Sequence, residues 1–152
     1  KVAIGAIKYS ILKQSIGSDI IYDFEKSISF EGDSGPYLQY SFARANSVLE
    51  KARAEKVKAS FKNIPNEITN LEKLMNRFPE VVESAINEYA PQYIVTYIVE
   101  IARAFNSFYG EHMIVDENEK VVTEHRLALA RAIQIVIKNG LYLLGIKTPE
   151  KM

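Results

Sequence analysis

The sequence contains no cysteine, which excludes disulfide frameworks, thiolate nucleophiles and zinc sites built on thiolates. It also lacks a long apolar run: the longest stretch without a charged residue is Tyr89–Val99, eleven residues that include Pro91. A membrane-spanning helix needs about 20 apolar residues. Nineteen basic residues balance nineteen acidic residues, so the net charge does not single out a nucleic acid as the partner. Because no opening segment has the pattern of a secretory signal, we expect a cytoplasmic protein with no membrane partner.

Helical periodicity dominates the 152 residues, which are enough for one domain with its own core. Apolar residues spaced by four and three positions predict a helix that starts near Pro36 and buries Leu38, Phe42, Ala45, Leu49 and Ala52. Ser34 or Gly35 would cap its start. Similar patterns predict helices over residues 68–78, 79–89, 91–110 and 123–145, with Ile68, Ile86 and Tyr89 among the inward-facing residues. Thr123 and Gly145 are the expected caps of the last helix. The expected fold is therefore an all-α bundle of about five main helices.

Two segments do not have a helical pattern. Residues 19–24 are apolar and rich in β-branched and aromatic side chains, and residues 113–115 and 121–122 flank a polar turn and are compatible with a small hairpin. Both could equally be extended loop, and a solvated connection between helices is the simpler interpretation of residues 111–122. Residues 32–36 are rich in glycine, serine and proline, which predicts a boundary between an N-terminal piece, residues 1–35, and a helical domain, residues 36–152.

No catalytic constellation is visible. Residues 32–35 read Gly-Asp-Ser-Gly, which is similar to the nucleophile loop of chymotrypsin-like proteases, but no histidine precedes His112 to act as the general base. His112 and His125 are thirteen residues apart, without the spacing that places two metal ligands on one helix. Glycine-rich phosphate loops are absent as well. We therefore expect neither a metal nor a cofactor in this chain.

Basic residues are concentrated in one part of the chain. Residues 44–62 contain six basic and two acidic side chains, whereas residues 63–100 contain two basic and six acidic ones. Arg44, Lys51 and Lys58 recur every seven residues, so on one helix they would form a basic stripe able to follow a phosphate backbone. The simpler interpretation is a solvated helix face. Tyrosines on the predicted helices could stack on unpaired RNA bases, or pack at the rim of the core with the hydroxyl at the surface.

Longer stretches of the sequence resemble arginyl-tRNA synthetases. Residues 30–40, Phe-Glu-Gly-Asp-Ser-Gly-Pro-Tyr-Leu-Gln-Tyr, are close to diagnostic for that family, and residues 5–14 and 43–44 agree with it. In the second half the matching stretches are Ala-Phe-Asn-Ser-Phe-Tyr at 104–109, Arg-Leu-Ala-Leu at 126–129, and residues 139–146 and 149–152. The resemblance covers essentially the whole chain.

The resemblance implies that the chain is a C-terminal fragment of such an enzyme. Residues 1–35 would end a class I catalytic region, and residues 36–152 would form its all-helical anticodon-binding bundle. In that family the residues at the positions of Tyr109 and Met152 approach the anticodon loop. Asn106 shares a matched motif with Tyr109, and Arg44 lies in another. The candidate tRNA-binding residues are therefore Tyr109, Met152, Asn106, Arg44, Lys51 and Lys58, of which the two lysines rest on the basic stripe alone.

The parent enzyme would join arginine to its tRNA with ATP and Mg²⁺. The family's ATP-binding motifs, which are similar to His-Ile-Gly-His and Lys-Met-Ser-Lys-Ser, are absent from this chain. We therefore expect a monomer that binds the anticodon loop of arginine tRNA but does not catalyse the reaction. The alternative is a free-standing helical domain that binds a protein through the basic helix or through the acidic helices on either side of Pro91. Sequence patterning alone does not separate the two.

Overall fold

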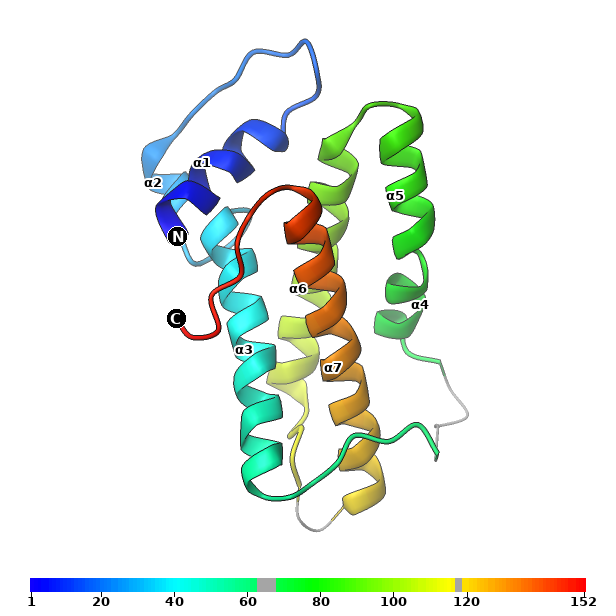
Figure 1. The fold of residues 1–152 in the computed structure, drawn as a ribbon. Coiled ribbons are helices and arrows are strands. Elements are labelled where there is room, and N and C mark those ends of the chain that lie inside the picture. The colour runs from blue at the N-terminus through cyan, green and yellow to red at the C-terminus, as the bar shows by residue number, and fades with distance from the viewer. Residues whose placement is uncertain (63–67, 117–118) are drawn as a thin grey trace.

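The computed structural model describes residues 1–62, 68–116 and 119–152, and within these ranges all regular structure is helical (Figure 1). The helices are α1 (Val2–Leu12), α2 (Phe24–Ile28), α3 (Gly35–Ala54), α4 (Asn70–Asn76), α5 (Phe78–Asn87), α6 (Pro91–Glu111) and α7 (Lys120–Leu143). The long helices α3, α6 and α7 pack along one another, α4 and α5 cover one side, and α1 and α2 lie at the end where α3 begins. The expected all-helical bundle is confirmed, with α3 to α7 as its five members.

Helix α3 starts where the sequence predicts. The Ser34 side-chain oxygen accepts a hydrogen bond from the Tyr37 backbone N–H at 3.0 Å, and Pro36 occupies the first turn, where a missing N–H leaves no hydrogen bond unmade. The whole predicted apolar stripe, Leu38, Phe42, Ala45, Leu49 and Ala52, is buried. This face of α3 packs against α7 and α6 and forms one wall of the core.

The other end of α3 corrects the prediction of a basic stripe. Lys56 adopts a left-handed conformation with φ of 58°, and the Val57 N–H donates to the Ala52 carbonyl at 2.9 Å, which closes the helix after Ala54. Lys58 therefore lies beyond the helix. The prediction that it continues a helical row with the two earlier basic residues is wrong. The left-handed residue that ends a helix is usually a glycine, and here it is Lys56, so the sequence carries no glycine to mark the helix end.

Helix α7 begins at Lys120, three residues before the predicted cap. Thr123 is buried in the first turn, where its side-chain oxygen accepts from the Asp116 N–H and donates to the Asp116 carbonyl, both at 2.9 Å. Residues 121–122 are helical and residues 113–115 form no strand, so the hairpin alternative is wrong and the simpler interpretation, a connection between helices, is right. Residues 117–118, in the turn of that hairpin, lie outside the described ranges.

The end of α7 follows the prediction. Gly145 has a φ of 65°, its N–H donates to the Tyr142 carbonyl at 2.9 Å, and the Ile146 N–H reaches the Leu141 carbonyl at 2.8 Å. This pair of hydrogen bonds around a left-handed glycine is the Schellman arrangement. It turns the chain back toward α3, so that the residues after Gly145 run beside that helix (Figure 1).

The core between the long helices is tightly packed. Its largest fully buried side chains include Phe105, Leu38 and Ile101. Helices α6 and α7 approach closely at Gly140, where a Cβ atom would lie 2.4 Å from Cγ2 of Ile98. Packing favours a glycine here because the branched Ile98 side chain fills the space that a larger residue would need.

Three residues predicted to face inward are exposed, namely Ile68, Ile86 and Tyr89. Ile68 precedes α4, and Tyr89 follows α5 with a left-handed φ of 52°, so neither lies on a helix. Ile86 is on α5, but that helix packs mainly against α6 and buries only Ala85 completely. A helix that packs against one long neighbour buries only part of its apolar face, so the rest of that face, including Ile86, stays exposed.

Helix α4 is joined to α7 by polar contacts. Thr69 and Glu72 form a capping box: the Thr69 oxygen accepts from the Glu72 N–H at 3.3 Å, and the Glu72 carboxylate accepts from the Thr69 N–H at 2.8 Å. Glu72 also lies 3.5 Å from Nε2 of the buried His125 on α7. Although burial opposes it, these hydrogen bonds and the charge of a protonated His125 lower the pKa of Glu72 below its ordinary value.

The N-terminal piece packs directly on the bundle. A Cβ atom at Gly35 would lie 2.4 Å from the carbonyl oxygen of Gly5, so α1 and the start of α3 meet backbone to backbone. Residues 19–23 are extended loop rather than a strand, and α2 begins at Phe24. At this end Asp33 pairs with Arg103 of α6, which gives the piece a second attachment.

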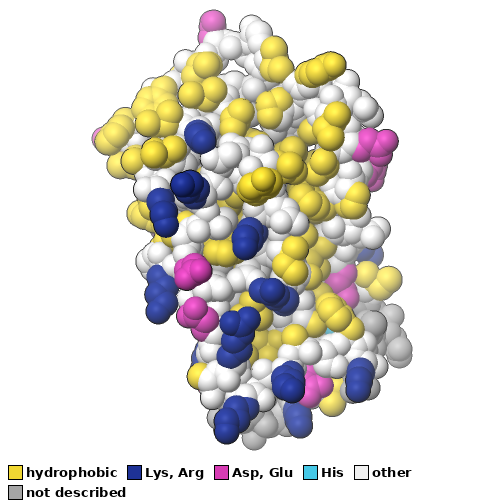
Figure 2. Space-filling model, viewed as in Figure 1, with side chains coloured by type: hydrophobic (Ala, Val, Ile, Leu, Met, Phe, Trp, Pro, Cys, Tyr) yellow, Lys and Arg dark blue, Asp and Glu magenta, His cyan; other side chains and the backbone are white. Residues whose placement is uncertain are grey.

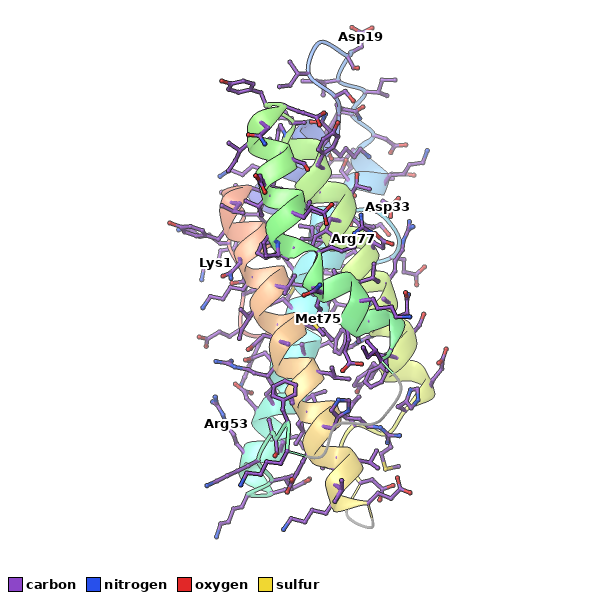
Figure 3. The ribbon with its side chains drawn as sticks, turned by 90° about the vertical axis from the view of Figure 1, so that its right-hand side faces the viewer. Lys1, Asp19, Asp33, Arg53, Met75 and Arg77 are labelled. Carbon is purple, nitrogen blue, oxygen red and sulfur yellow. The ribbon has the colours of Figure 1, made fainter. Side chains whose placement is uncertain are left out.

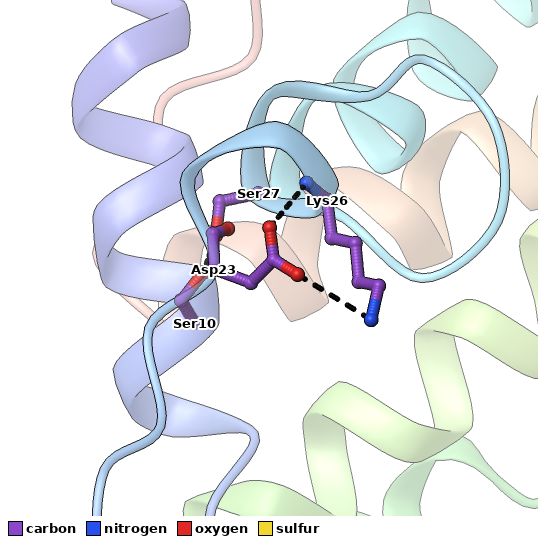
Figure 4. A network of polar contacts seen from close by, with 4 residues as sticks. All are labelled: Ser10, Asp23, Lys26 and Ser27. Atoms are coloured by element: carbon purple, nitrogen blue, oxygen red, sulfur yellow. Dashed lines mark hydrogen bonds and ion pairs between the residues drawn. The ribbon is translucent and has the colours of Figure 1, made fainter.

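Helix α2 is attached to α1 by a small polar network (Figure 4). The Ser10 and Ser27 hydroxyls lie 2.9 Å apart and are buried, and Asp23 caps α2 by accepting from the Lys26 N–H at 3.1 Å. The Lys26 ammonium lies 3.4 Å from the same carboxylate. These short-range contacts hold a five-residue helix that could not form alone.

Candidate nucleic-acid interface

A cavity of about 370 Å³ lies where α3, the end of α6 and the C-terminal segment meet. It is lined by four of the six candidate residues, Arg44, Lys51, Tyr109 and Met152, together with Tyr40, Ala43, Ser47 and Val48. Helix periodicity explains the α3 contribution, because Tyr40, Arg44 and Lys51 lie on one side of that helix. The structure thus brings together residues that are up to 112 positions apart in the sequence.

Arg44 is the centre of this cluster. Its guanidinium carbon lies 4.7 Å from the centre of the Tyr40 ring and 5.1 Å from the centre of the Tyr109 ring. Its Nη2 donates to the Tyr40 hydroxyl at 2.9 Å. Both rings face a cation that is only partly exposed, a geometry in which the aromatic quadrupole attracts the charge. The guanidinium is held in a fixed orientation and still lines the cavity.

Asn106 holds the Arg44 guanidinium through a hydrogen bond and does not itself line the cavity. The Asn106 carbonyl oxygen accepts from Nη1 of Arg44 at 2.6 Å, and its amide nitrogen donates to the Tyr37 hydroxyl at 2.9 Å and to Oγ of Ser41 at 3.0 Å. Both amide hydrogens of Asn106 are therefore used inside the protein. Asn106 is absent from the cavity lining, and it contacts the cavity residue Arg44 instead.

The C-terminal segment is attached to α3 along its length. The Gln39 amide donates to the Lys147 carbonyl at 2.7 Å, and the Asn46 amide donates to the Glu150 carbonyl at 3.2 Å. These two contacts, seven residues apart on α3, guide the chain to Met152 beside the cavity. Tyr109 and Met152 keep 40% and 45% of their surface exposed, so both have surface left for a ligand.

The two candidate lysines differ in position. Lys51 lines the cavity, is exposed, and lies 3.8 Å from Glu55, a contact that solvent screens. Lys58 instead lines a separate cavity of about 460 Å³ with Lys56, Lys120 and Glu124. Lysine and arginine side chains gather over the lower part of the molecule in Figure 2. Arg53 lies at this lower end in Figure 3, and Asp19 lies at the opposite end. Only Lys51 belongs to the cluster around Arg44.

The other tyrosines of α6 have different roles. Tyr97 is buried, its hydroxyl donates to the Leu74 carbonyl at 2.8 Å, and burial raises its pKa to about 12. Tyr93 is 38% exposed, and its hydroxyl donates to Glu88, away from the cavity. Core packing is therefore the right interpretation of Tyr97, whereas Tyr109 has an exposed ring at a cavity.

Sequence reasoning missed Tyr40 as a site residue. The available signal was its spacing of four from Arg44, which places two side chains on one helix face. That signal alone does not show that Tyr109 of another helix lies against the same guanidinium. Among the described residues, no group of histidine and carboxylate side chains could hold a metal ion, and no helix is long and apolar enough to cross a membrane.

Comparison with known proteins gives consistent matches. Residues 38–152 match the family described as the DALR anticodon binding domain. The chain is 40% identical over 152 residues to arginine–tRNA ligase 1 of Bacillus cereus, covering all of this chain and 27% of that protein. It is 41% identical over 157 residues to the arginine–tRNA ligase of Pyrococcus abyssi, again covering all of this chain and 25% of that protein.

Solved structures agree with these sequence matches. Arginyl-tRNA synthetase of Thermus thermophilus superposes with a TM-score of 0.78 at 32% identity, over 99% of this chain and 26% of that one. The enzyme from Plasmodium falciparum gives a TM-score of 0.81 at 25% identity, over 99% of this chain and 27% of that one. The chain thus spans about a quarter of the length of the relatives it matches.

Proposed function

We propose, from the premise that this chain belongs to the DALR anticodon binding domain family, that it binds the anticodon loop of arginine tRNA as part of an arginine–tRNA ligase. The observation that carries the proposal is the cavity at which Tyr109, Arg44 and Met152 converge. Unpaired bases in RNA loops are recognised by stacking on aromatic rings and by hydrogen bonds to their edges, and this cavity offers both.

The chemistry of the cavity suits a cytosine. Arginine anticodons share a central C, whose O2 and N3 atoms accept hydrogen bonds. The Arg44 guanidinium carries several donors in one plane, of which one is used by Asn106 and one by Tyr40. Tyr109 keeps 40% of its surface exposed, which leaves part of an aromatic side chain for stacking, and the unbranched thioether of Met152 can pack against the same base.

The catalytic part of the reaction would belong to the longer protein. We assign residues 1–35 to the end of its class I catalytic region and residues 36–152 to the anticodon-binding bundle. ATP and Mg²⁺ would be bound by segments that this chain lacks, since neither ATP-binding motif of the family is present. The isolated chain should therefore leave ATP–pyrophosphate exchange at background when arginine and tRNA are supplied, and turnover by this chain alone would contradict the assignment.

A protein-binding role is the competing proposal, and salt separates the two. RNA binding releases counterions, so its affinity falls steeply with salt, whereas an apolar protein interface changes little. A titration of this chain with arginine tRNA at two salt concentrations measures the difference. Affinity that is weak and independent of salt would favour the protein-binding role.

The specific test is Tyr109→Ala. Stacking of a base on an aromatic ring contributes roughly 1–3 kcal/mol, so the variant should bind arginine tRNA about tenfold more weakly, with little change for a tRNA carrying another central anticodon base. Tyr93→Ala is the matched control, because Tyr93 is equally exposed on the same helix but lies outside the cavity. Circular dichroism shows whether the helices are intact. A variant that keeps its full preference for central C would contradict the role of Tyr109.

A further inference from the structure

A second cavity of about 340 Å³ lies beside the first and shares the wall formed by Tyr109. Lys51, Val48 and Tyr109 line both cavities, and Gly110, His112 and Met113 line only the second. We propose that this second cavity binds the nucleotide next to the central anticodon base, with Lys51 at the phosphate that joins the two nucleotides. The inference rests on the proposed function and extends it from one base to two.

Gly110 is the strongest sign that the second cavity is kept open. It lies in the last turn of α6 with no positive φ, so the backbone does not require glycine. A Cβ atom added there would meet nothing within 4 Å, so packing does not require glycine either. Glycine weakens a helix relative to alanine. What the missing side chain does provide is space in the cavity that Gly110 lines.

Lys51 is placed to serve both cavities. Consecutive nucleotides of a single strand share one phosphate, and a cation between two base sites can neutralise it. Among the described residues, Lys51 is the only basic side chain lining both cavities, and its contact with Glu55 at 3.8 Å is solvent-exposed and easily exchanged. The prediction that Lys51 binds backbone phosphate therefore gains a specific location.

The remaining walls fit a base and its sugar. Met113 is 68% exposed and offers an apolar surface that a base could cover. The His112 ring stacks on Phe108 at 4.7 Å between ring centres, and its Nδ1 lies 3.1 Å from the Phe108 carbonyl. With the proton of a neutral His112 on Nδ1, its Nε2 is an acceptor for an amino group or a ribose hydroxyl. The second cavity therefore has a polar wall formed by His112 and an apolar wall formed by Met113.

The test adds a side chain at Gly110, which lines the second cavity and not the first. Gly110→Leu should lower the affinity of this chain for an RNA stem-loop with an arginine anticodon by about fivefold or more, the loss expected when one base no longer stacks. Ser107→Leu is the matched control, at an exposed position on the same helix that lines neither cavity. Gly110→Ala should raise the melting temperature by about 1–2 °C, because the added methyl group favours the helix and meets no neighbour.

Abasic RNAs identify the occupant. The stem-loop is made with the base removed from either neighbour of the central C. For one of these two RNAs, Gly110→Leu and the unchanged chain should bind with equal affinity. Gly110→Leu binding the intact stem-loop like the unchanged chain, or losing the same affinity for both abasic RNAs as for the intact one, would overturn the second site. If Tyr109→Ala still loses its preference for central C in that case, the proposed function stands; if it does not, the proposed function fails separately.

Discussion

Replacing Asn106 with alanine removes the support behind the Arg44 guanidinium. The side chain makes two neutral hydrogen bonds, to Tyr37 and Ser41, and one charge-assisted bond from Arg44. Neutral bonds contribute about 0.5–1.5 kcal/mol each and charge-assisted ones about 1.5–3 kcal/mol. Because the site is half-buried and water can replace part of these contacts, we expect Asn106→Ala to lower the free energy of unfolding by about 2–3 kcal/mol.

Urea unfolding followed by circular dichroism measures this change. Asn106→Asp is the informative companion, since it keeps an acceptor for Arg44 and loses both donors, so its loss should be smaller. A second comparison uses RNA affinity: if Asn106 acts only through Arg44, then Asn106→Ala has no further effect in an Arg44→Ala background. A loss of stability below about 0.5 kcal/mol, or an equal loss of RNA affinity in both backgrounds, would refute the positioning role.

Three further predictions test other parts of the structure. Gly140→Ala places a methyl group against Ile98 and should lower the free energy of unfolding by about 1–2 kcal/mol in urea titrations, whereas a neutral result would contradict the close crossing of α6 and α7. Lys51→Ala should reduce the slope of log affinity against log salt for tRNA by about 1, and Lys58→Ala should reduce it less, since only Lys51 lines the cavity. The lowered pKa of Glu72 means that its ionised carboxylate stabilises the fold above the ordinary carboxyl value of 4.5, and this stabilisation is lost as the pH falls through the folded pKa. Glu72→Gln should therefore weaken the pH dependence of the free energy of unfolding over that acidic range. An unchanged pH dependence would contradict this contribution.

Features that depend on nearby residues could be predicted from the sequence. Ser34 caps the start of α3 and Gly145 follows the end of α7 as expected, because a side-chain cap and a left-handed glycine act within a few residues. The apolar stripe from Leu38 to Ala52 is buried for the same reason, since its period alone determines which side of α3 is apolar. The resemblance to a family then supplied Tyr109 and Met152, and the structure places both at one cavity.

Features that depend on tertiary packing could not be predicted. Nothing local predicts that α3 ends before Lys56, a residue with no special preference for a left-handed backbone, so the sequence pattern wrongly predicts that Lys58 continues the helix. Thr123 has the chemistry of a cap, yet its partner is the backbone of Asp116 in the preceding connection. The spacing of Tyr40 from Arg44 predicts a shared helix face, but it does not predict that α6 brings Tyr109 to the same guanidinium.

The clamped guanidinium of Arg44 has a consequence for the entropy of binding. A free arginine side chain has about 2 kcal/mol of rotamer entropy to lose when a ligand fixes it. Here two rings, the Asn106 carbonyl oxygen and the Tyr40 hydroxyl restrict that side chain as the protein folds. The ordering is complete before an RNA arrives, which is how preorganised sites retain more of their contact energy as affinity. In the complex we propose, most of the conformational freedom lost on association therefore belongs to the anticodon loop.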